Sequence, residues 1–176
     1  MPPLDRAPPG SARTSGARIL TRPATPLARC DVLTADETFA VFARAREIAL
    51  DLGHDQIGPL HLTLAVLATP DPLTADVLRA LRVDAHALTN ALRRAARPGT
   101  YQVGVSGGPD LAYTARGARV LHGSRDEAGR LGHRVVHPLH VLLAVLAEPT
   151  PDVTPVLAES ELTRDALQAA LAAEVP

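Results

Sequence analysis

Apolar positions near the start of the folded part of the chain repeat with the spacing of an α-helix. Steps of four, three and four residues separate Val41, Ala45, Ile48 and Leu52. Such spacing places the four side chains on one face of a helix, with charged residues between them on the other. Thr34 to Glu37 has the form of a capping box, so the pattern predicts an amphipathic helix that begins there and ends at Gly53.

A second, shorter run is apolar on every side. It reads LHLTLAVLA over residues 60–68 and follows Pro59. Proline suits the first turn of a helix, and a helix that is apolar all round is expected to be buried on all sides. Two short helices are predicted over 74–82 and 85–96, the latter capped by Asp84. The pattern therefore predicts a unit of four helices.

The whole unit is written twice. LGHDQIGPLHLTLAVLATP, residues 52–70, returns as LGHRVVHPLHVLLAVLAEP, residues 131–149, with 12 of 19 positions identical. The offset, 131 − 52 = 79, continues without a gap on both sides, for example from Val41 to Val120 and from Leu88 to Leu167. Duplication of the unit predicts an all-α fold of two four-helix repeats, with about eight helices.

Two features distinguish the second copy. Its first helix, predicted from Thr114 to Leu131, contains Gly117, Gly123 and Gly129. Each glycine costs a helix up to about 1 kcal/mol relative to alanine. Either tertiary packing compensates for this cost, or the small residues allow another backbone to approach closely. The Gly- and Pro-rich segment 97–112 that precedes the copy is predicted to be a flexible linker.

Residues 1–33 differ from the rest of the chain. They are rich in Pro, Gly, Ser and Thr, contain five Arg and two Asp, and show no sustained apolar period. This composition predicts a disordered Pro/Arg-rich tail. An organelle transit peptide is the alternative, whereas the apolar core of a secretory signal is absent.

Composition narrows the classes of function. The net charge is −1, and all 18 basic residues are Arg, so no overall attraction to nucleic acid or to an anionic membrane is expected. Cys30 is a single cysteine and cannot form an intramolecular disulfide. The longest apolar runs fall far short of the ~20 residues that cross a bilayer. We expect a cytoplasmic protein.

The repeated order of elements resembles a known family. A helix, the tripeptide Leu-Gly-His, a short loop and an apolar helix, followed by two short helices, is similar to the N-terminal domain of the Clp/Hsp100 unfoldases, especially ClpC and ClpA. Tyr113-Thr114-Ala115-Arg116 resembles the family's F-T-x-x-A start. The resemblance covers residues 34–173, as repeat one (34–96), the linker (97–112) and repeat two (113–173). It implies a pseudo-two-fold bundle of eight helices.

The resemblance also implies a function. In the family this domain lies in front of two AAA+ ATPase rings and docks substrates and adaptors. The chain has no lysine and so no G-x-x-x-x-G-K-[ST] loop for ATP. We therefore expect a stand-alone, non-enzymatic module without a cofactor that binds Clp unfoldase or peptidase components, client proteins or cyclic-peptide ligands. An adaptor, a substrate-docking protein and a decoy all fit this description. An accessory subunit docked on the Clp peptidase is an alternative.

Histidines raise the alternative of an enzyme. His133, His137 and His140 are enough ligands to hold zinc, as a metal-dependent hydrolase on this fold would require. His137, however, corresponds to Gly58 in the first copy, so the duplication did not keep a triad. Local hydrogen bonding of the paired histidines is the simpler interpretation. No serine, cysteine or carboxylate pattern indicates a catalytic residue.

Some members of the family bind phosphorylated arginine, which indicates candidate site residues. Thr114 and Arg116 match the phosphate half of such a site in repeat two, where Tyr113 is a further candidate contact, whereas Thr34 is displaced by one position in repeat one. The family's I-G-T-E-H segment places a carboxylate where this chain has Leu60 and Leu139. We therefore expect weak or no phosphoarginine binding, because leucine cannot pair with a guanidinium. The two leucines are either contacts for apolar peptides or ordinary surface residues.

Overall fold

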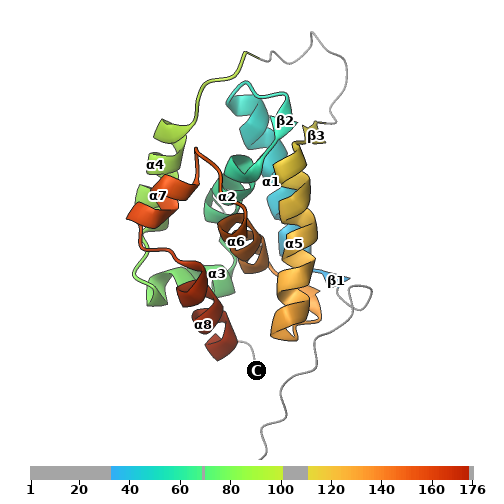
Figure 1. Cartoon of the computed structure of the whole chain (residues 1–176), viewed down its shortest axis with the longest axis vertical. Coiled ribbons are helices and arrows are strands. Elements are labelled where there is room, and N and C mark those ends of the chain that lie inside the picture. Colours follow the sequence, from blue (N-terminus) through green and yellow to red (C-terminus); the bar gives the residue numbers. More distant parts are fainter. Residues whose placement is uncertain (1–32, 69, 101–110, 175–176) are drawn as a thin grey trace, which may run out of the picture.

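The computed structural model describes residues 33–68, 70–100 and 111–174. Within these residues the chain forms eight helices and four strands of two residues each, so the predicted all-α class is confirmed (Figure 1). Repeat one contains α1 (Asp36–Asp51), α2 (Pro59–Ala68), α3 (Pro72–Ala80) and α4 (Ala85–Ala95). Repeat two contains α5 (Ala115–Leu131), α6 (Pro138–Ala147), α7 (Thr154–Glu159) and α8 (Arg164–Glu174). The predicted tail, apart from Leu33, lies outside the described residues.

The two repeats are joined by two short parallel seams. Strand β1 (Leu33–Thr34) pairs with β4 (Val135–Val136), and β2 (Gln56–Ile57) pairs with β3 (Ala112–Tyr113). Adding 79 to the residues of β1 and β2 gives those of β3 and β4, so each repeat lends its opening residues to the loop of the other. This exchange is the pseudo-two-fold relation that the duplication implied.

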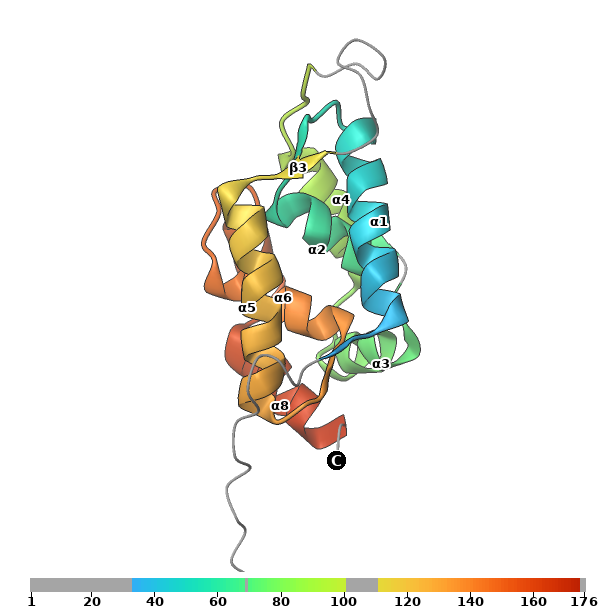
Figure 2. The ribbon, with the colours of Figure 1, turned by 90° about the vertical axis from the view of Figure 1, so that its right-hand side faces the viewer.

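The core lies between the repeats. Helices α2 and α6 occupy the centre, and α1 and α5 flank them while running in opposite directions (Figure 2). Nearly every residue of α2 and α6 is buried, as their unbroken apolar composition predicted. A single hydrophobic cluster contains residues from both repeats, so neither repeat has a core of its own.

The starts of α1 and α5 show how the repeats have diverged. The Thr114 Oγ1 accepts a hydrogen bond from the Gly117 N–H at 2.9 Å and caps α5. In repeat one the equivalent residue is Ala35, which caps α1 without a side-chain hydrogen bond. The predicted capping box at Thr34 is therefore wrong. Thr34 lies in β1, where its pairing with Val136 moves the helix start one residue along the chain.

Gly117 allows a close approach between the repeats, one of the two roles expected of the glycines in α5. A Cβ atom at this position would lie 2.4 Å from the Ile57 carbonyl oxygen, which is far inside a normal contact. In repeat one, Thr38 takes the same place and donates its hydroxyl to the Val136 oxygen at 2.7 Å. The backbones of the two repeats thus come closer together at Gly117 than at Thr38, where a side chain bridges the seam.

The first residues of the linker are attached to repeat one. The Gly99 N–H donates to the Leu52 oxygen at 2.8 Å, and His54 Nε2 lies 2.7 Å from the Arg97 oxygen. At its other end, Ala112 belongs to β3. Both described ends are thus hydrogen-bonded to the loop between α1 and α2, and the flexibility of the linker stays a prediction. Residues 101–110 lie outside the described residues.

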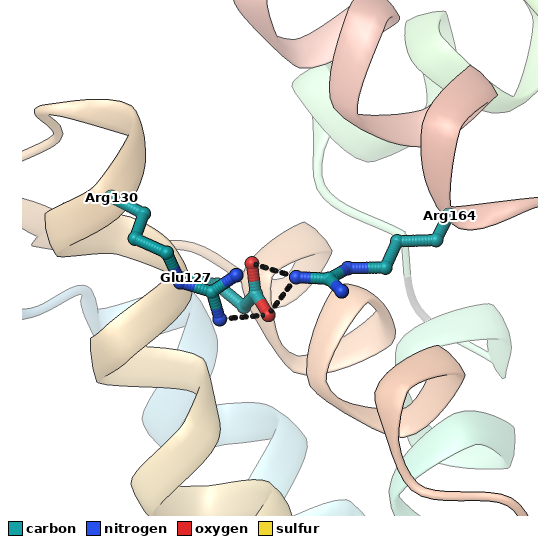
Figure 3. A network of polar contacts seen from close by, with 3 residues as sticks. All are labelled: Glu127, Arg130 and Arg164. Atoms are coloured by element: carbon teal, nitrogen blue, oxygen red, sulfur yellow. Dashed lines mark hydrogen bonds and ion pairs between the residues drawn. The ribbon is translucent and has the colours of Figure 1, made fainter.

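A buried carboxylate ties α5 to the start of α8. Glu127 is 2% exposed and accepts hydrogen bonds from Arg130 at 2.5 Å and from Arg164 at 2.9 Å (Figure 3). The equivalent positions in repeat one, 127 − 79 = 48 and 164 − 79 = 85, hold Ile48 and Ala85. One repeat thus uses an ion-pair network where the other uses apolar packing.

A Gly117→Ala substitution should destabilise the protein, whereas Gly123→Ala should not. Both add a methyl group within α5 and gain helix propensity, worth about 1 kcal/mol. The Cβ at position 117 meets a backbone oxygen, but the Cβ at position 123 would lie 3.3 Å from the Ala144 Cβ, a contact that small shifts relieve. Urea unfolding of the two variants measures the difference. Equal stability would contradict the seam geometry.

Replacing Glu127 with the isoleucine that repeat one has at the equivalent position should restore most of the stability lost when Arg164 is removed. Arg164→Ala alone leaves Glu127 buried with one partner and should lower the free energy of unfolding by about 2 kcal/mol. Adding Glu127→Ile should recover most of this loss, since a buried ion pair can often be replaced by apolar groups. Urea unfolding of the single and double variants checks this. A double variant less stable than Arg164→Ala would refute it.

Candidate functional site

A pocket of about 360 Å³ lies where repeat one meets the start of repeat two. Three segments line it: the loop before α2, the first turn of α5, and the loop between α6 and α7. We call it the α5 pocket. It is lined by Gly58, Pro59, Leu60, Thr114, Ala115, Arg116 and residues 150–153. Because the β2–β3 seam brings these segments together, the pocket depends on the junction of both repeats.

The seam places the α5 N-terminus in the pocket wall. The Thr114 N–H donates to the Ile57 oxygen at 2.9 Å, and its side chain caps the helix. Ala115 and Arg116 are the first two residues of α5, where helical N–H groups have no partner within the helix. The partial positive charge of a helix N-terminus favours an anionic group at such a position.

Two charged side chains of opposite sign line the pocket. Arg116 is exposed on the first turn of α5, and Asp152 is partly buried in the loop between α6 and α7. Among the described residues neither takes part in an ion pair. Both charges are thus available to a ligand.

The remaining wall of the pocket is apolar. Leu60 is 7% exposed, Val153 is buried, and Pro151 lies at the surface. Thr150, also buried, has a hydroxyl without a hydrogen-bond partner among the described residues. The pocket therefore combines an apolar surface with a site for an anion, an arrangement typical of peptide and small-molecule sites.

The structure brings together three of the six predicted site residues. Thr114, Arg116 and Leu60 line the α5 pocket, and Tyr113 precedes them in β3. Tyr113 is half-buried, and its burial raises the pKa of the phenol. Thr34 instead lines a separate small cavity of about 70 Å³. Thr114, Arg116 and Leu60 thus share one pocket that Thr34 does not line, and the role of these residues in binding stays a prediction.

Leu139 does not lie at the surface. It is 0% exposed, because α6 is buried on all sides, including its first turn. Both interpretations of this leucine, as a peptide contact and as an ordinary surface residue, assumed exposure and are wrong. The expectation that repeat one carries a second, similar site therefore loses its apolar contact.

Asp152 was missed by the sequence analysis. It corresponds to Leu73 in repeat one, since 152 − 79 = 73, so the duplication gave no reason to expect a carboxylate there. The residue enters the pocket through the loop that follows α6, whose path no local pattern fixes. Only the short spacing between the prolines at 149 and 151 hinted that this loop is held in a defined place.

The corresponding face of repeat one has a different charge. The positions equivalent to Thr114 and Arg116 are Ala35 and Glu37, since 114 − 79 = 35 and 116 − 79 = 37. A hydroxyl cap and a cation in repeat two are thus replaced by a methyl group and a carboxylate. The two repeats cannot bind the same anionic ligand in the same way.

Each repeat contains a hydrogen-bonded pair of histidines, of which one, His61 or His140, is buried. His54 Nδ1 lies 2.7 Å from His61 Nε2, and the Gly58 N–H donates to His61 Nδ1 at 2.8 Å. His133 and His140 repeat the arrangement at 2.8 Å, with the His137 N–H as donor. We call each arrangement a histidine relay. Desolvation by burial, and then the neighbouring histidine, lowers the pKa of His61 to about 4 and that of His140 to about 3.

The relay explains the histidines that suggested zinc. Both ring nitrogens of His140 already have hydrogen-bonding partners, so a metal would have to displace them. Among the described residues no group of three or more His, Cys, Asp or Glu side chains is arranged to hold a metal ion. Local hydrogen bonding is the role that the geometry supports.

The chain is similar in sequence to the N-terminal region of Clp proteins. The family profile described as "Clp repeat (R) N-terminal domain" matches residues 35–160. The ClpC ATP-binding subunits of the ATP-dependent Clp protease from Staphylococcus saprophyticus and Staphylococcus aureus are each 32% identical over 108 residues, or 61% of this chain. The matched region is 13% of the length of each relative, so the chain corresponds to a small part of those proteins.

Solved structures share the fold. The Hsp104 N-terminal domain of Candida albicans has a TM-score of 0.63 at 17% identity, covering 81% of this chain and 91% of that one. The N-terminal domain of ClpD from Arabidopsis thaliana has a TM-score of 0.58 at 15% identity, covering 78% and 90%. Among the described residues, no helix has the length and apolar composition needed to cross a membrane.

The buried histidines should make stability depend on pH. Their pKa values are lower in the folded than in the unfolded chain, so their full contribution is present above pH 6.5 and is lost as the pH falls towards 4. His61 alone should account for about 3 kcal/mol of this loss. Urea unfolding of the wild type and of His61→Gln at several pH values measures the contribution of His61 to the pH dependence of stability.

The matched control is His122→Gln, which changes an exposed histidine on α5. This variant should keep the pH dependence of the wild type, whereas His61→Gln should weaken it. The same pH dependence in all three proteins would show that the relay does not titrate as described.

Proposed function

Because the chain belongs to the Clp repeat (R) N-terminal domain family, we propose that it is a peptide-docking module of a Clp chaperone and protease system. The α5 pocket is the proposed docking site. The observation that carries the proposal is that one pocket brings together the first turn of α5, the apolar Leu60 and Arg116, whose side chain forms no ion pair with a described residue.

Different parts of the pocket suit different groups of a bound peptide. An anionic group of a peptide is held by the N–H groups at the start of α5 and by the Arg116 guanidinium, as charge-assisted hydrogen bonds. A neighbouring apolar side chain packs against Leu60 and Val153. Asp152 favours a cationic group beside the anion and disfavours a second anion. The pocket would thus select peptides by the position of their charged groups relative to an apolar side chain.

The proposed partners are Clp unfoldase or peptidase components, client proteins and cyclic-peptide ligands, in a bacterial cytoplasm. The relatives are much longer proteins, and the region they share with this chain contains no lysine here, hence no ATP-binding loop of the usual form. A module without such a loop can hold a ligand, and it can compete with other proteins for that ligand. An adaptor, a docking protein and a decoy all follow from this property.

The alternative functions receive less support. No described residue singles out the Clp peptidase as the surface to which the chain docks. A metal-dependent hydrolase would need free histidine ligands, whereas the relays use both ring nitrogens of His61 and of His140. Binding without catalysis is therefore the proposal that the site supports best.

Phosphoarginine is a specific case. The expectation of weak or absent binding rests on Leu60 and Leu139, which are both buried. Asp152 is the carboxylate that lines the α5 pocket, and the sequence argument did not consider it. Titration calorimetry of wild type and Asp152→Asn with phosphoarginine decides the matter. Micromolar binding that is lost in the variant would overturn the expectation.

Reversal of the charge at position 116 should weaken peptide binding. We expect Arg116→Glu to reduce affinity about tenfold or more, since it replaces a charge-assisted hydrogen bond with repulsion. The probes are fluorescent peptides that combine a carboxylate or phosphate with leucine or phenylalanine, and the measurement is fluorescence anisotropy at two salt concentrations. The affinity of the wild type should fall as the salt concentration rises.

The matched control is Arg93→Glu, which makes the same charge change at an exposed position on α4 outside the pocket. This variant should bind like the wild type. Equal weakening by both variants would indicate a general effect of net charge, and the α5 pocket would then not be the docking site.

A further inference from the structure

The Gly58 peptide forms part of the wall of the α5 pocket and is held from two sides. Its N–H donates to His61 Nδ1 at 2.8 Å, and its oxygen accepts from the His61 N–H at 3.1 Å. The preceding Ile57 oxygen accepts from the Thr114 N–H at 2.9 Å. The side chain of His61 therefore holds the segment that joins the pocket wall to the seam.

The hydrogen bonds of the relay fix where its protons lie. Because a backbone N–H can only donate, His61 Nδ1 must accept and its proton must be on Nε2. That Nε2–H donates to His54 Nδ1, which leaves the His54 proton on Nε2 to donate to the Arg97 oxygen. The relay thus runs in one direction, from Gly58 through both rings to Arg97.

Adding a proton is incompatible with this order. A proton on His61 Nδ1 would face the Gly58 N–H at a distance of 2.8 Å, where two donors repel each other. A proton on His54 Nδ1 would face the His61 Nε2–H in the same way. Either event removes one hydrogen bond of the relay and forces the groups apart.

The charged groups around the relay do not stabilise an added proton. Asp55 follows His54 in the loop, Arg97 contacts His54 through its backbone oxygen, and Arg116 and Asp152 line the α5 pocket. Among the described residues no carboxylate forms an ion pair with His54 or His61. His61 is itself buried, so an imidazolium there lacks both water and a counter-ion.

We propose that His61 is a positioning residue of the α5 pocket, whose neutral ring fixes the Gly58 wall, and that protonation of His61 displaces this wall. The pocket is then intact at neutral pH and altered in acid. This inference rests on the proposed function only for the claim that the pocket is a binding site. The movement of Gly58 itself can be measured without any ligand.

The second relay provides an internal comparison. His140 accepts from the His137 N–H at 2.8 Å, and the neighbouring seam joins the Ala35 N–H to the Val136 oxygen at 3.1 Å. The chemistry is the same, but His137 does not line the α5 pocket. Burial lowers the pKa of His140 to about 3, below the value of about 4 for His61. Acid should therefore act on both relays, but only the first relay adjoins the α5 pocket.

Nuclear magnetic resonance of the full chain between pH 7.5 and 3.5 tests the proposal. At neutral pH, long-range proton–nitrogen spectra should show His61 protonated on Nε2. As the pH falls, the Gly58 and Thr114 amide signals should move together with the His61 ring, with a midpoint near pH 4, while signals from the α2 core remain those of the folded protein. A Gly58 amide that stays in place while His61 titrates would overturn the proposal.

The conservative variant His61→Gln separates titration from mere packing. Glutamine can accept from Gly58 and donate to His54, so the Gly58 and Thr114 signals should match those of the wild type at neutral pH and lose their acid transition. An acid transition as large as that of the wild type would refute the role of His61. If this variant fails to fold, the wild-type ring decides, because a neutral His61 protonated on Nδ1 would refute the proposed order of protons.

Failure of this inference and failure of the proposed function can be told apart. Loss of peptide binding in the anisotropy experiment would leave the movement of the Gly58 wall unaffected. Conversely, an unmoving wall would leave peptide binding at Arg116 intact but independent of the relay.

Discussion

Two helices without a polar face impose the main constraint on this protein. Helices α2 and α6 are buried on nearly every residue, so each must be surrounded by other elements. A single unit of four helices leaves one side of its central helix uncovered. Joining two copies lets α2 and α6 cover each other, with α1 and α5 on the flanks. The duplication is therefore a requirement of burial, and the seams and the pocket follow from it.

Duplication also explains why one pocket arises between segments that are far apart in the sequence. Each repeat gives its opening strand to the loop of the other, which places a helix N-terminus beside the start of a buried helix in both halves. The side chains at these places then diverged. Arg116 of repeat two corresponds to Glu37 of repeat one, and Gly117 corresponds to Thr38. The same arrangement of strands and helices thus carries the proposed anion site in one half and an acidic helix start in the other.

The sequence predicted the parts of the structure that depend on local physics. The helices, the prolines that open α2 and α6, and the Asp84 cap all follow from spacing and hydrogen-bonding capacity, and they are confirmed. Thr34 was misplaced because pairing with the other repeat decides where α1 begins. Leu139 was wrong, and Asp152 missed, because both depend on how loops and helices pack in three dimensions. Periodicity carries no information on either.

The histidine relays show how burial and hydrogen bonding together can make a polar group rigid. A neutral imidazole has one donor and one acceptor, and His61 and His140 use both within the protein. At neutral pH such rings cost little to bury, since every polar atom is satisfied. The same arrangement disfavours an added proton, because it would have to replace one of these hydrogen bonds. In repeat two the relay holds the loop before α6 although His137 does not line the α5 pocket, so the relay's first role is to hold the loop before the central helix. In repeat one that loop also lines the α5 pocket, so the hydrogen bonds that hold the loop also hold part of the pocket wall.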